Sequence, residues 1–226
     1  MVFADRQEAG QRLARRLLHL KDQHPVVLAL PRGGVPVGYE VARALAAPLD
    51  LVLVRKIGAP DQPELAIGAI ADGEPPELVT DPQLASWLAV PPEYLEATKA
   101  RELKEIERRR KLYVGDRARA QVRGRTAILV DDGMATGATM RAALRATRRR
   151  APARLVLAVP VAAPDTLARM QGEADEIVCL GTPAGFMSVG QFYRRFPQLE
   201  DAEVIALMEA ARKLAPAGQT APGAQH

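Results

Sequence analysis

The chain contains 226 residues, of which 48% are hydrophobic and 4% aromatic, with 31 Lys and Arg against 27 Asp and Glu and a net charge of +4. This length suits one sizeable α/β domain with an insertion and is short for two full domains. The lone Cys179 excludes an internal disulfide, and no apolar run is long enough to cross a bilayer. We therefore expect a cytoplasmic protein without membrane contact.

Apolar runs of strand length alternate with helical patterns along most of the chain. The first helix is predicted where Asp5 precedes Glu8 by three residues, a spacing typical of a helix N-terminus. Strands that alternate with helices pair in parallel through right-handed crossovers. The pattern thus predicts an α/β fold with a five-stranded, mainly parallel sheet and helices on both faces. The predicted strands cover residues 26–30, 49–54, 127–130, 155–161 and 176–180.

Residues 57–125 form a long insertion between the second and third predicted strands. Residues 64–72 have hairpin character, and residues 92–112 fit a helix with acid–base pairs four residues apart. The basic run over residues 108–111 fits either a nucleic-acid stripe or a solvated helix face. The interleaved glutamates favour the solvated face, so nucleic acid is not an expected partner.

The chain after the last predicted strand has two parts of different composition. Residues 181–214 hold an aromatic-rich loop, expected as a small hood over about residues 181–200, and a helix around residues 204–214. Residues 215–226 are rich in Pro, Gly, Ala and Gln, so we expect a disordered tail there. A single domain over residues 1–214 is the resulting prediction.

The most informative segment lies at the end of the third predicted strand. Residues 127–130 are apolar throughout, as in a strand buried on both faces of a parallel sheet. Asp131 and Asp132 follow directly, at the strand end where ligands of open α/β sheets bind. The turn over residues 135–139 offers backbone N–H groups, two hydroxyls and a helix N-terminus, which suit a phosphate dianion. Acids for sugar hydroxyls beside a phosphate turn describe a ribose-5-phosphate site, and a plain helix-capping turn is the structural alternative.

The same segment resembles the phosphoribosyl pyrophosphate (PRPP) motif of type I phosphoribosyltransferases, in which four apolar residues, two acids and a short spacer precede Thr-Gly-x-Thr. The resemblance implies that Asp131 and Asp132 are the catalytic pair, which binds the ribose 2′- and 3′-hydroxyls. It also implies Mg²⁺, held indirectly by these acids through ribose hydroxyls or water. The residues implied to wrap the 5′-phosphate are Ala135, Thr136, Gly137, Ala138 and Thr139.

Two further runs resemble pyrophosphate-binding elements of the family. Arg32, Gly33 and Gly34 follow the first predicted strand and open a helix, where two glycines let backbone amides approach an anion closely. Arg55 and Lys56 end the second predicted strand, in a run similar to one in adenine phosphoribosyltransferases, and would neutralise a pyrophosphate leaving group. A common strand-to-helix turn and a solvated basic turn are the structural alternatives.

The sequence says less about which base accepts the ribose-5-phosphate. Hypoxanthine-guanine phosphoribosyltransferases carry an aspartate where this chain has Ala135, so their 6-oxopurine chemistry is not expected, and the run looks closer to the adenine and uracil enzymes. An aromatic ring of the hood would stack on a base for about 1–3 kcal/mol while the others pack, or all the rings would form the small core of the hood. The expected base-binding residues are Phe186, Phe192 and Tyr193.

These features predict a phosphoribosyltransferase that transfers ribose-5-phosphate from PRPP to a nucleobase or related nitrogen nucleophile and releases pyrophosphate. Its expected partners are PRPP and a small-molecule base, while the identity of the base stays open and a homodimer is compatible with the sequence. Residues 64–72 would close over the site and exclude water. The alternative is a regulatory protein that senses PRPP or a nucleotide on the same fold without turnover, for which the basic helix is the support.

Overall fold

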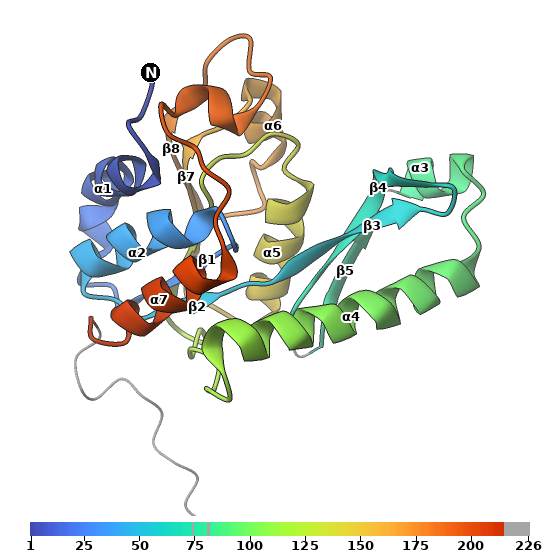
Figure 1. Cartoon of the computed structure of the whole chain (residues 1–226), viewed down its shortest axis with the longest axis horizontal. Helices are drawn as coiled ribbons and strands as arrows, with labels where there is room; N and C mark the ends of the chain where they lie inside the picture. The colour runs from blue at the N-terminus through green and yellow to red at the C-terminus, as the bar shows by residue number, and fades with distance from the viewer. Residues whose placement is uncertain (74, 81, 215–226) are drawn as a thin grey trace, which may run out of the picture.

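A five-stranded sheet lies at the centre of the computed structural model, which describes residues 1–73, 75–80 and 82–214 (Figure 1). The strand order is β2-β1-β6-β7-β8, and each neighbouring pair is parallel. The expected α/β fold with a five-stranded sheet is confirmed. The strands are β1 (Pro25–Ala29), β2 (Leu49–Leu51), β6 (Thr126–Val130), β7 (Arg154–Val161) and β8 (Glu176–Gly181).

Helices cover both faces of this sheet, because successive strand residues point to opposite sides. The helices of the core are α1 (Arg6–Leu17), η1 (Leu18–Leu20), α2 (Gly34–Leu45), α5 (Ala138–Arg149), α6 (Pro164–Arg169) and α7 (Asp201–Ala211). On one face Val27 and Ile128 belong to a core shared with α1 and α2. On the other face Leu28 and Leu129 belong to a core shared with α5. The central strand β1 and residues 127–130 and 155–161 of β6 and β7 are apolar throughout, because neither face of the sheet meets water there.

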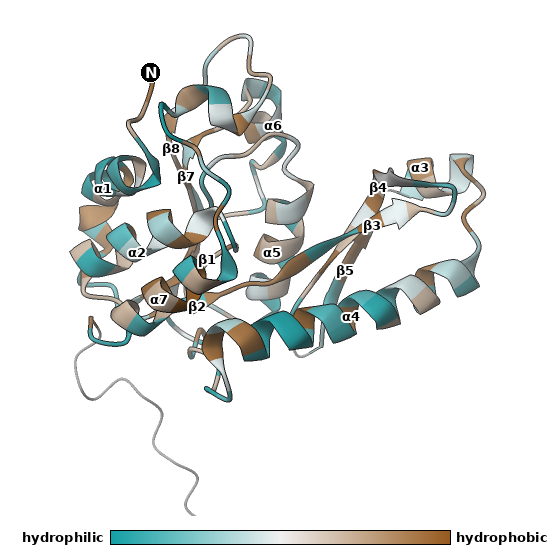
Figure 2. Ribbon diagram, in the orientation of Figure 1, coloured by the Kyte–Doolittle hydropathy of each residue, from teal (hydrophilic) through white to brown (hydrophobic). Residues whose placement is uncertain are grey.

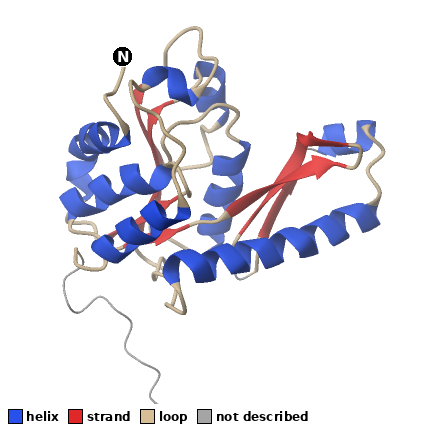
Figure 3. Cartoon of the chain, in the orientation of Figure 1, coloured by secondary structure: helices blue, strands red, loops and turns tan. Residues whose placement is uncertain are grey.

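A second, antiparallel sheet and two helices form an arm that extends from the core (Figures 1 and 3). The elements of the arm are β3 (Val54–Ala59), β4 (Gln62–Ala71), β5 (Glu77–Thr80), α3 (Pro82–Trp87) and α4 (Pro92–Val114). Ala69 and Ala71 of β4 pack against Ala142 and Ala146 of α5, where small side chains let sheet and helix approach closely. Figure 2 shows hydrophilic residues along the middle of α4. Residues 64–72, expected as a cover for the site, belong mostly to the middle strand of this sheet.

The run over residues 49–54, predicted as one strand, divides between the two sheets. Its first half is β2, and its last residue begins β3 in the arm. Between them the Leu53 N–H donates to Asp72 Oδ1 at 2.9 Å, so a side chain takes a donor that a strand neighbour would otherwise use. Because of this division, Arg55 and Lys56 lie on an arm strand and not at the carboxyl end of β2, which corrects the prediction.

The C-terminal segment folds back onto the start of the chain. η2 (Val189–Phe192) follows β8, and the Phe3 N–H donates to the Phe192 carbonyl at 2.8 Å while the Arg194 N–H donates to the Phe3 carbonyl at 2.8 Å. Residues 215–226, predicted as a tail, lie outside the described part of the chain. Within the described part, no helix combines the length and apolar character that crossing a membrane requires.

Candidate functional site

Two acidic side chains follow the last residue of β6, at the carboxyl edge of the central sheet. All five residues of β6 are buried, so the chain first approaches solvent at Asp131, which is half-buried. Asp132 is only 9% exposed. The Asp132 N–H donates to Asp131 Oδ1 at 2.8 Å, which fixes the turn between them. The pair thus lies at the strand end where the sequence placed it.

The loop after β1 packs directly against this acid pair, because β1 and β6 are parallel neighbours and their carboxyl ends meet at one edge. A Cβ atom on Gly33 would lie 2.1 Å from Asp132 Oδ2, and one on Gly34 would lie 2.7 Å from the Val130 carbonyl oxygen. The backbone leaves no room for a side chain at Gly34, and a side chain at Gly33 would displace the Asp132 carboxylate. Gly34 also begins α2, so a helix N-terminus faces the same edge.

The turn over residues 135–139 supplies a second helix N-terminus. Gly137 has a φ of 78° and precedes the first residue of the twelve-residue helix α5. The Thr166 hydroxyl donates to the Ala135 carbonyl at 2.5 Å, which fixes the turn from behind. Ala135 and Thr136 are exposed and Thr139 is half-buried, so the turn presents N–H groups and hydroxyls at the surface. A turn of this kind at a helix N-terminus is able to bind an anion.

Burial raises the pKa of both carboxyl groups above the ordinary value for aspartic acid. For Asp131 the negative charge of Asp132 adds to the effect of burial. For Asp132 the hydrogen bond and the charge of Arg6 oppose the effect of burial. Neighbouring acids with raised pKa values form a place where a cation or hydroxyl donors would stabilise the charged state.

Arg6 is the site residue that the sequence interpretation missed. Its Nε donates to Asp132 Oδ2 at 2.7 Å, and its side chain is 10% exposed. Arg6 is the first residue of α1, where a positive charge opposes the helix dipole. That unfavourable position could have pointed to Arg6 in the sequence, because a positive charge at a helix N-terminus needs an acidic partner from another part of the fold.

A cavity of about 470 Å³ opens beside the acid pair. It brings the glycine loop and Asp132 beside residues 196–199 of the C-terminal segment, and the glycine loop lies more than half the chain away from that segment in sequence. Its lining residues are Arg6, Arg32, Gly33, Asp132, Phe196, Pro197, Gln198 and Leu199. Arg32 also lines this cavity, and its Nη1 lies 3.7 Å from Asp201 Oδ1.

The second basic pair does not join this cavity. Arg55 Nε donates to Glu102 Oε2 of α4 at 2.8 Å, so its charge is used within the arm. Lys56 is exposed at the start of β3 and is absent from the cavity lining among the described residues. The expectation that this pair lies beside the glycine loop at adjoining strand ends is therefore corrected.

The hood aromatics pack mainly against one another and against Phe3. Phe192 and Tyr193 are 7% and 6% exposed, and the Phe186 ring lies 5.2 Å from the Phe192 ring. Phe192 and Tyr193 thus form the small core of the hood and do not present a face for a base, which corrects their assignment. Phe196 lines the cavity instead.

The acid pair fits a metal ion only with help from a ligand. Among the described residues, no three His, Cys, Asp or Glu side chains gather closely enough to hold a metal ion. Asp131 and Asp132 offer carboxylate oxygens, and Mg²⁺ prefers oxygen ligands, keeps several waters and takes further ligands from substrate phosphates. The donor set therefore fits a Mg²⁺ ion that a phosphorylated ligand shares.

Comparisons with known proteins agree with this arrangement. Residues 5–181 match the family model described as "Phosphoribosyl transferase domain". Two Mycobacterium tuberculosis proteins, "Putative phosphoribosyl transferase MT0597" (strain CDC 1551) and "Putative phosphoribosyl transferase Rv0571c" (strain H37Rv), are each 47% identical over 212 residues. That alignment covers 94% of this chain and 47% of each relative, so the chain spans about half the length of these curated relatives. The crystal structure of TT1426 from Thermus thermophilus is 45% identical with a TM-score of 0.79, over 92% of this chain and 98% of that one.

Proposed function

Since the chain belongs to the phosphoribosyl transferase domain family, we propose that it transfers ribose-5-phosphate from PRPP to the nitrogen of a nucleobase or a related nucleophile and releases pyrophosphate. One observation carries the proposal. Gly33 and Gly34 lie against the acid pair so closely that no side chain fits between them. An anion-binding loop and sugar-binding acids in contact suit a ligand that carries pyrophosphate and ribose on adjacent atoms.

The proposed roles follow the order of groups along PRPP. The turn over residues 135–139 holds the 5′-phosphate at the start of α5, and Asp131 and Asp132 hold the ribose hydroxyls. Arg32 and the N–H groups at the start of α2 hold the pyrophosphate. The bond from C1 to the pyrophosphate oxygen breaks with its electron pair, and the acceptor nitrogen forms the new bond to C1 and loses its proton. Catalysis of this kind rests on positioning and on charge stabilisation.

Mg²⁺ fits this scheme through Asp131 and Asp132, by way of ribose hydroxyls or water. When bound with PRPP, the ion supplies positive charge to the pyrophosphate. The two carboxyl groups, whose pKa values burial raises, would then be stabilised in their charged forms.

The part of the cavity lined by residues 196–199 is the proposed acceptor side of the site, while Arg32 and Gly33 line its pyrophosphate side. Phe196 offers a ring edge or face, Gln198 offers an amide that donates and accepts, and Pro197 and Leu199 add apolar surface. This assignment replaces the buried rings Phe192 and Tyr193 as base-binding residues.

The regulatory alternative has lost its main support. That alternative depended on the basic run of α4 as a nucleic-acid-binding surface. Arg110 of this run is largely buried and pairs with Asp50 and Asp72. Arg108 and Arg109 pair with Glu105. A helix whose positive charges are paired in this way is a weak electrostatic partner for phosphates.

Pyrophosphate release tests the proposal. The wild-type protein is mixed with PRPP and Mg²⁺ and with adenine, uracil, guanine or hypoxanthine, and release is followed before steady state. Release that depends on a base and disappears with EDTA supports transfer. Calorimetric PRPP binding without release from any base would favour the sensor, and no PRPP binding at all would reject both readings.

Lys56 is tested in the same assay, because its exposed side chain remains a candidate for contact with the leaving pyrophosphate. If Lys56 contacts the pyrophosphate in the transition state, Lys56→Ala lowers the release rate at saturating PRPP more than it lowers PRPP affinity. An unchanged rate removes Lys56 from the proposed site and leaves transfer in place. Arg55→Met serves as a comparison, because its partner Glu102 lies within the arm.

A further inference from the structure

Arg6 connects parts of the protein that are far apart in the sequence. Its Nε donates to Asp132 Oδ2 at 2.7 Å, and its Nη1 donates to the Pro197 carbonyl at 2.8 Å. Its Cζ lies 3.8 Å from the centroid of the Phe196 ring. One guanidinium therefore touches the acid pair, the backbone of the C-terminal segment and an aromatic ring of the cavity.

These contacts make Arg6 rigid. A guanidinium that is largely removed from water is retained only where charge and hydrogen-bond partners compensate for lost hydration. Here Asp132 supplies the charge, Pro197 supplies an acceptor and Phe196 supplies a ring face. The planar fork satisfies all three at once, which an ammonium group cannot do in the same geometry.

A second contact binds the hood to the same acid. The Tyr193 hydroxyl donates to the Asp132 carbonyl at 2.5 Å. Residues 193–197 are thus fixed to Asp132 at its backbone by Tyr193 and at its carboxylate through Arg6. Both contacts link the segment that lines the cavity to Asp132.

We propose that Arg6 is a positioning residue, which holds Asp132 Oδ2 so that Oδ1 is left for a ribose hydroxyl and which ties the C-terminal segment to that carboxylate. This inference rests on the proposed function. Its consequence is coupling, in which binding of the sugar end of PRPP holds residues 193–199 more firmly around the acceptor cavity. A ligand without the sugar, such as pyrophosphate, is held by Arg32 and the glycine loop and does not depend on the position of Asp132.

The test uses Arg6→Gln, Arg6→Lys and the control Arg12→Gln, a partly exposed arginine on the same helix. Calorimetry measures the affinity for PRPP with Mg²⁺ and for pyrophosphate with Mg²⁺. Arg6→Gln should weaken PRPP binding by about tenfold to a hundredfold, as expected for loss of a hydrogen bond to a charged group, and should leave pyrophosphate affinity within about twofold. Arg6→Lys should recover part of the PRPP affinity, and Arg12→Gln should match wild type.

Hydrogen exchange supplies the second readout. PRPP should slow amide exchange over residues 193–199 in wild type and fail to do so in Arg6→Gln. If Arg6→Gln binds PRPP as wild type does, or loses PRPP and pyrophosphate affinity equally, the positioning role is wrong while the proposed function stands. If wild type does not bind PRPP, the proposed function fails and the positioning role fails with it.

Discussion

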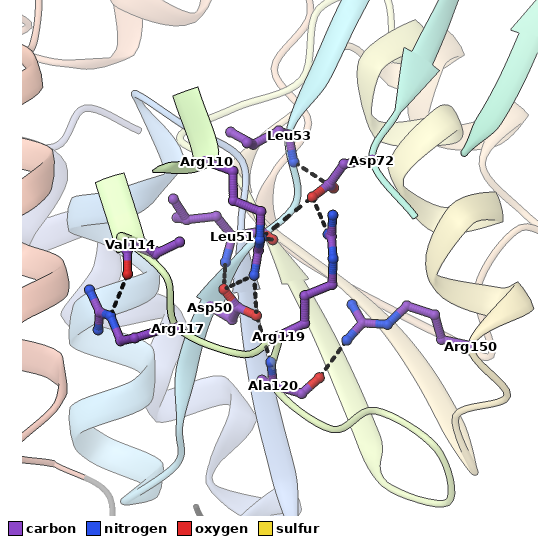
Figure 4. A network of polar contacts seen from close by, with 10 residues as sticks. All are labelled: Asp50, Leu51, Leu53, Asp72, Arg110, Val114, Arg117, Arg119, Ala120 and Arg150. Atoms are coloured by element: carbon purple, nitrogen blue, oxygen red, sulfur yellow. Dashed lines mark hydrogen bonds and ion pairs between the residues drawn. The ribbon is translucent and has the colours of Figure 1, made fainter. Parts of the chain in front are cut away.

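Two pairs of buried or half-buried aspartates, each in contact with arginine, lie at different places in this protein. One is the acid pair Asp131 and Asp132 at the end of β6. The other is Asp50 and Asp72, which we call the arm junction because it lies where the arm meets the core (Figure 4). The two pairs are similar in sequence, because each includes an aspartate beside apolar strand residues. Asp131 follows β6, and Asp50 lies within β2.

The arm junction satisfies its carboxylates fully from within the protein. Asp50 accepts two backbone N–H groups at 2.7 and 2.8 Å and also contacts Arg110 Nη2 at 3.2 Å. Asp72 accepts a backbone N–H group at 2.9 Å and contacts the guanidinium groups of Arg110 and Arg119. Such a network joins β2, β4 and α4 into one unit.

The carboxylates of the acid pair have fewer hydrogen-bond and charge partners than those of the arm junction. Burial raises both pKa values, Arg6 contacts one of the two carboxylates, and a cavity opens beside Asp132. The difference teaches that buried acids with complete partners hold a fold together, whereas buried acids with raised pKa values beside a cavity are candidates for ligand binding.

The largest expected effect concerns the arm junction. Arg110→Met removes a guanidinium that is 11% exposed and contacts both acids, so the free energy of unfolding should fall by about 3 kcal/mol. Arg108→Met is the control, because the Arg108 side chain is 61% exposed and its loss should cost about 0.5 kcal/mol or less. Urea unfolding measures both variants. Equal stabilities would mean that the arm junction contributes little to the fold.

The next effect separates the acid pair from the arm junction by ligand binding. Asp131→Asn with Asp132→Asn removes both negative charges while keeping the shape, and affinity for PRPP with Mg²⁺ should fall by about a hundredfold or more. Folded Arg110→Met should keep wild-type affinity. Calorimetry measures both, and unchanged PRPP affinity in the double variant would remove the acid pair from the proposed site.

A smaller effect is expected at the phosphate turn. Thr139→Val removes a hydroxyl proposed to donate to the 5′-phosphate, so ribose-5-phosphate and PRPP should bind about tenfold to a hundredfold more weakly. Thr147→Val on the same helix is the matched control, because its buried hydroxyl has no hydrogen-bond partner among the described residues. Pyrophosphate, which lacks the 5′-phosphate, should bind both variants as it binds wild type. A loss that is equal for all three ligands would assign Thr139 a structural role.

The smallest effect concerns stability at the acid pair. A carboxyl group whose pKa is raised by folding binds a proton in the folded state at a pH where the unfolded chain does not, so stability falls as pH rises from the ordinary value of 3.8 through the folded value. Asp131→Asn removes this loss and should raise the free energy of unfolding at pH 7 by about 0.5–2 kcal/mol. Urea unfolding of wild type and variant from pH 4 to pH 8 should show the gap widening with pH. A gap independent of pH would contradict the raised pKa.

The sequence predicted more of the core than of its surroundings. The five strands, the Asp5 helix start and the resemblance to type I phosphoribosyltransferases are confirmed, because buried strands and a helix cap depend on local residue order. The strand predicted over residues 49–54 was wrong in extent, since the bond from Leu53 to Asp72 joins residues far apart along the chain. Arg110 was assigned to a solvated face for the same reason, as its partners come from two other elements.

By itself the sequence determined where the strand-end acids, the glycine loop and the phosphate turn lie along the chain, because each is a short run whose chemistry is legible residue by residue. Only the tertiary structure decided which side chains surround them. Arg6 reaches Asp132 from α1, and Phe196 packs on the Arg6 guanidinium from the C-terminal segment, while the Phe192 and Tyr193 rings are taken into the core of the hood. Such contacts depend on packing between distant segments, which a local pattern does not encode.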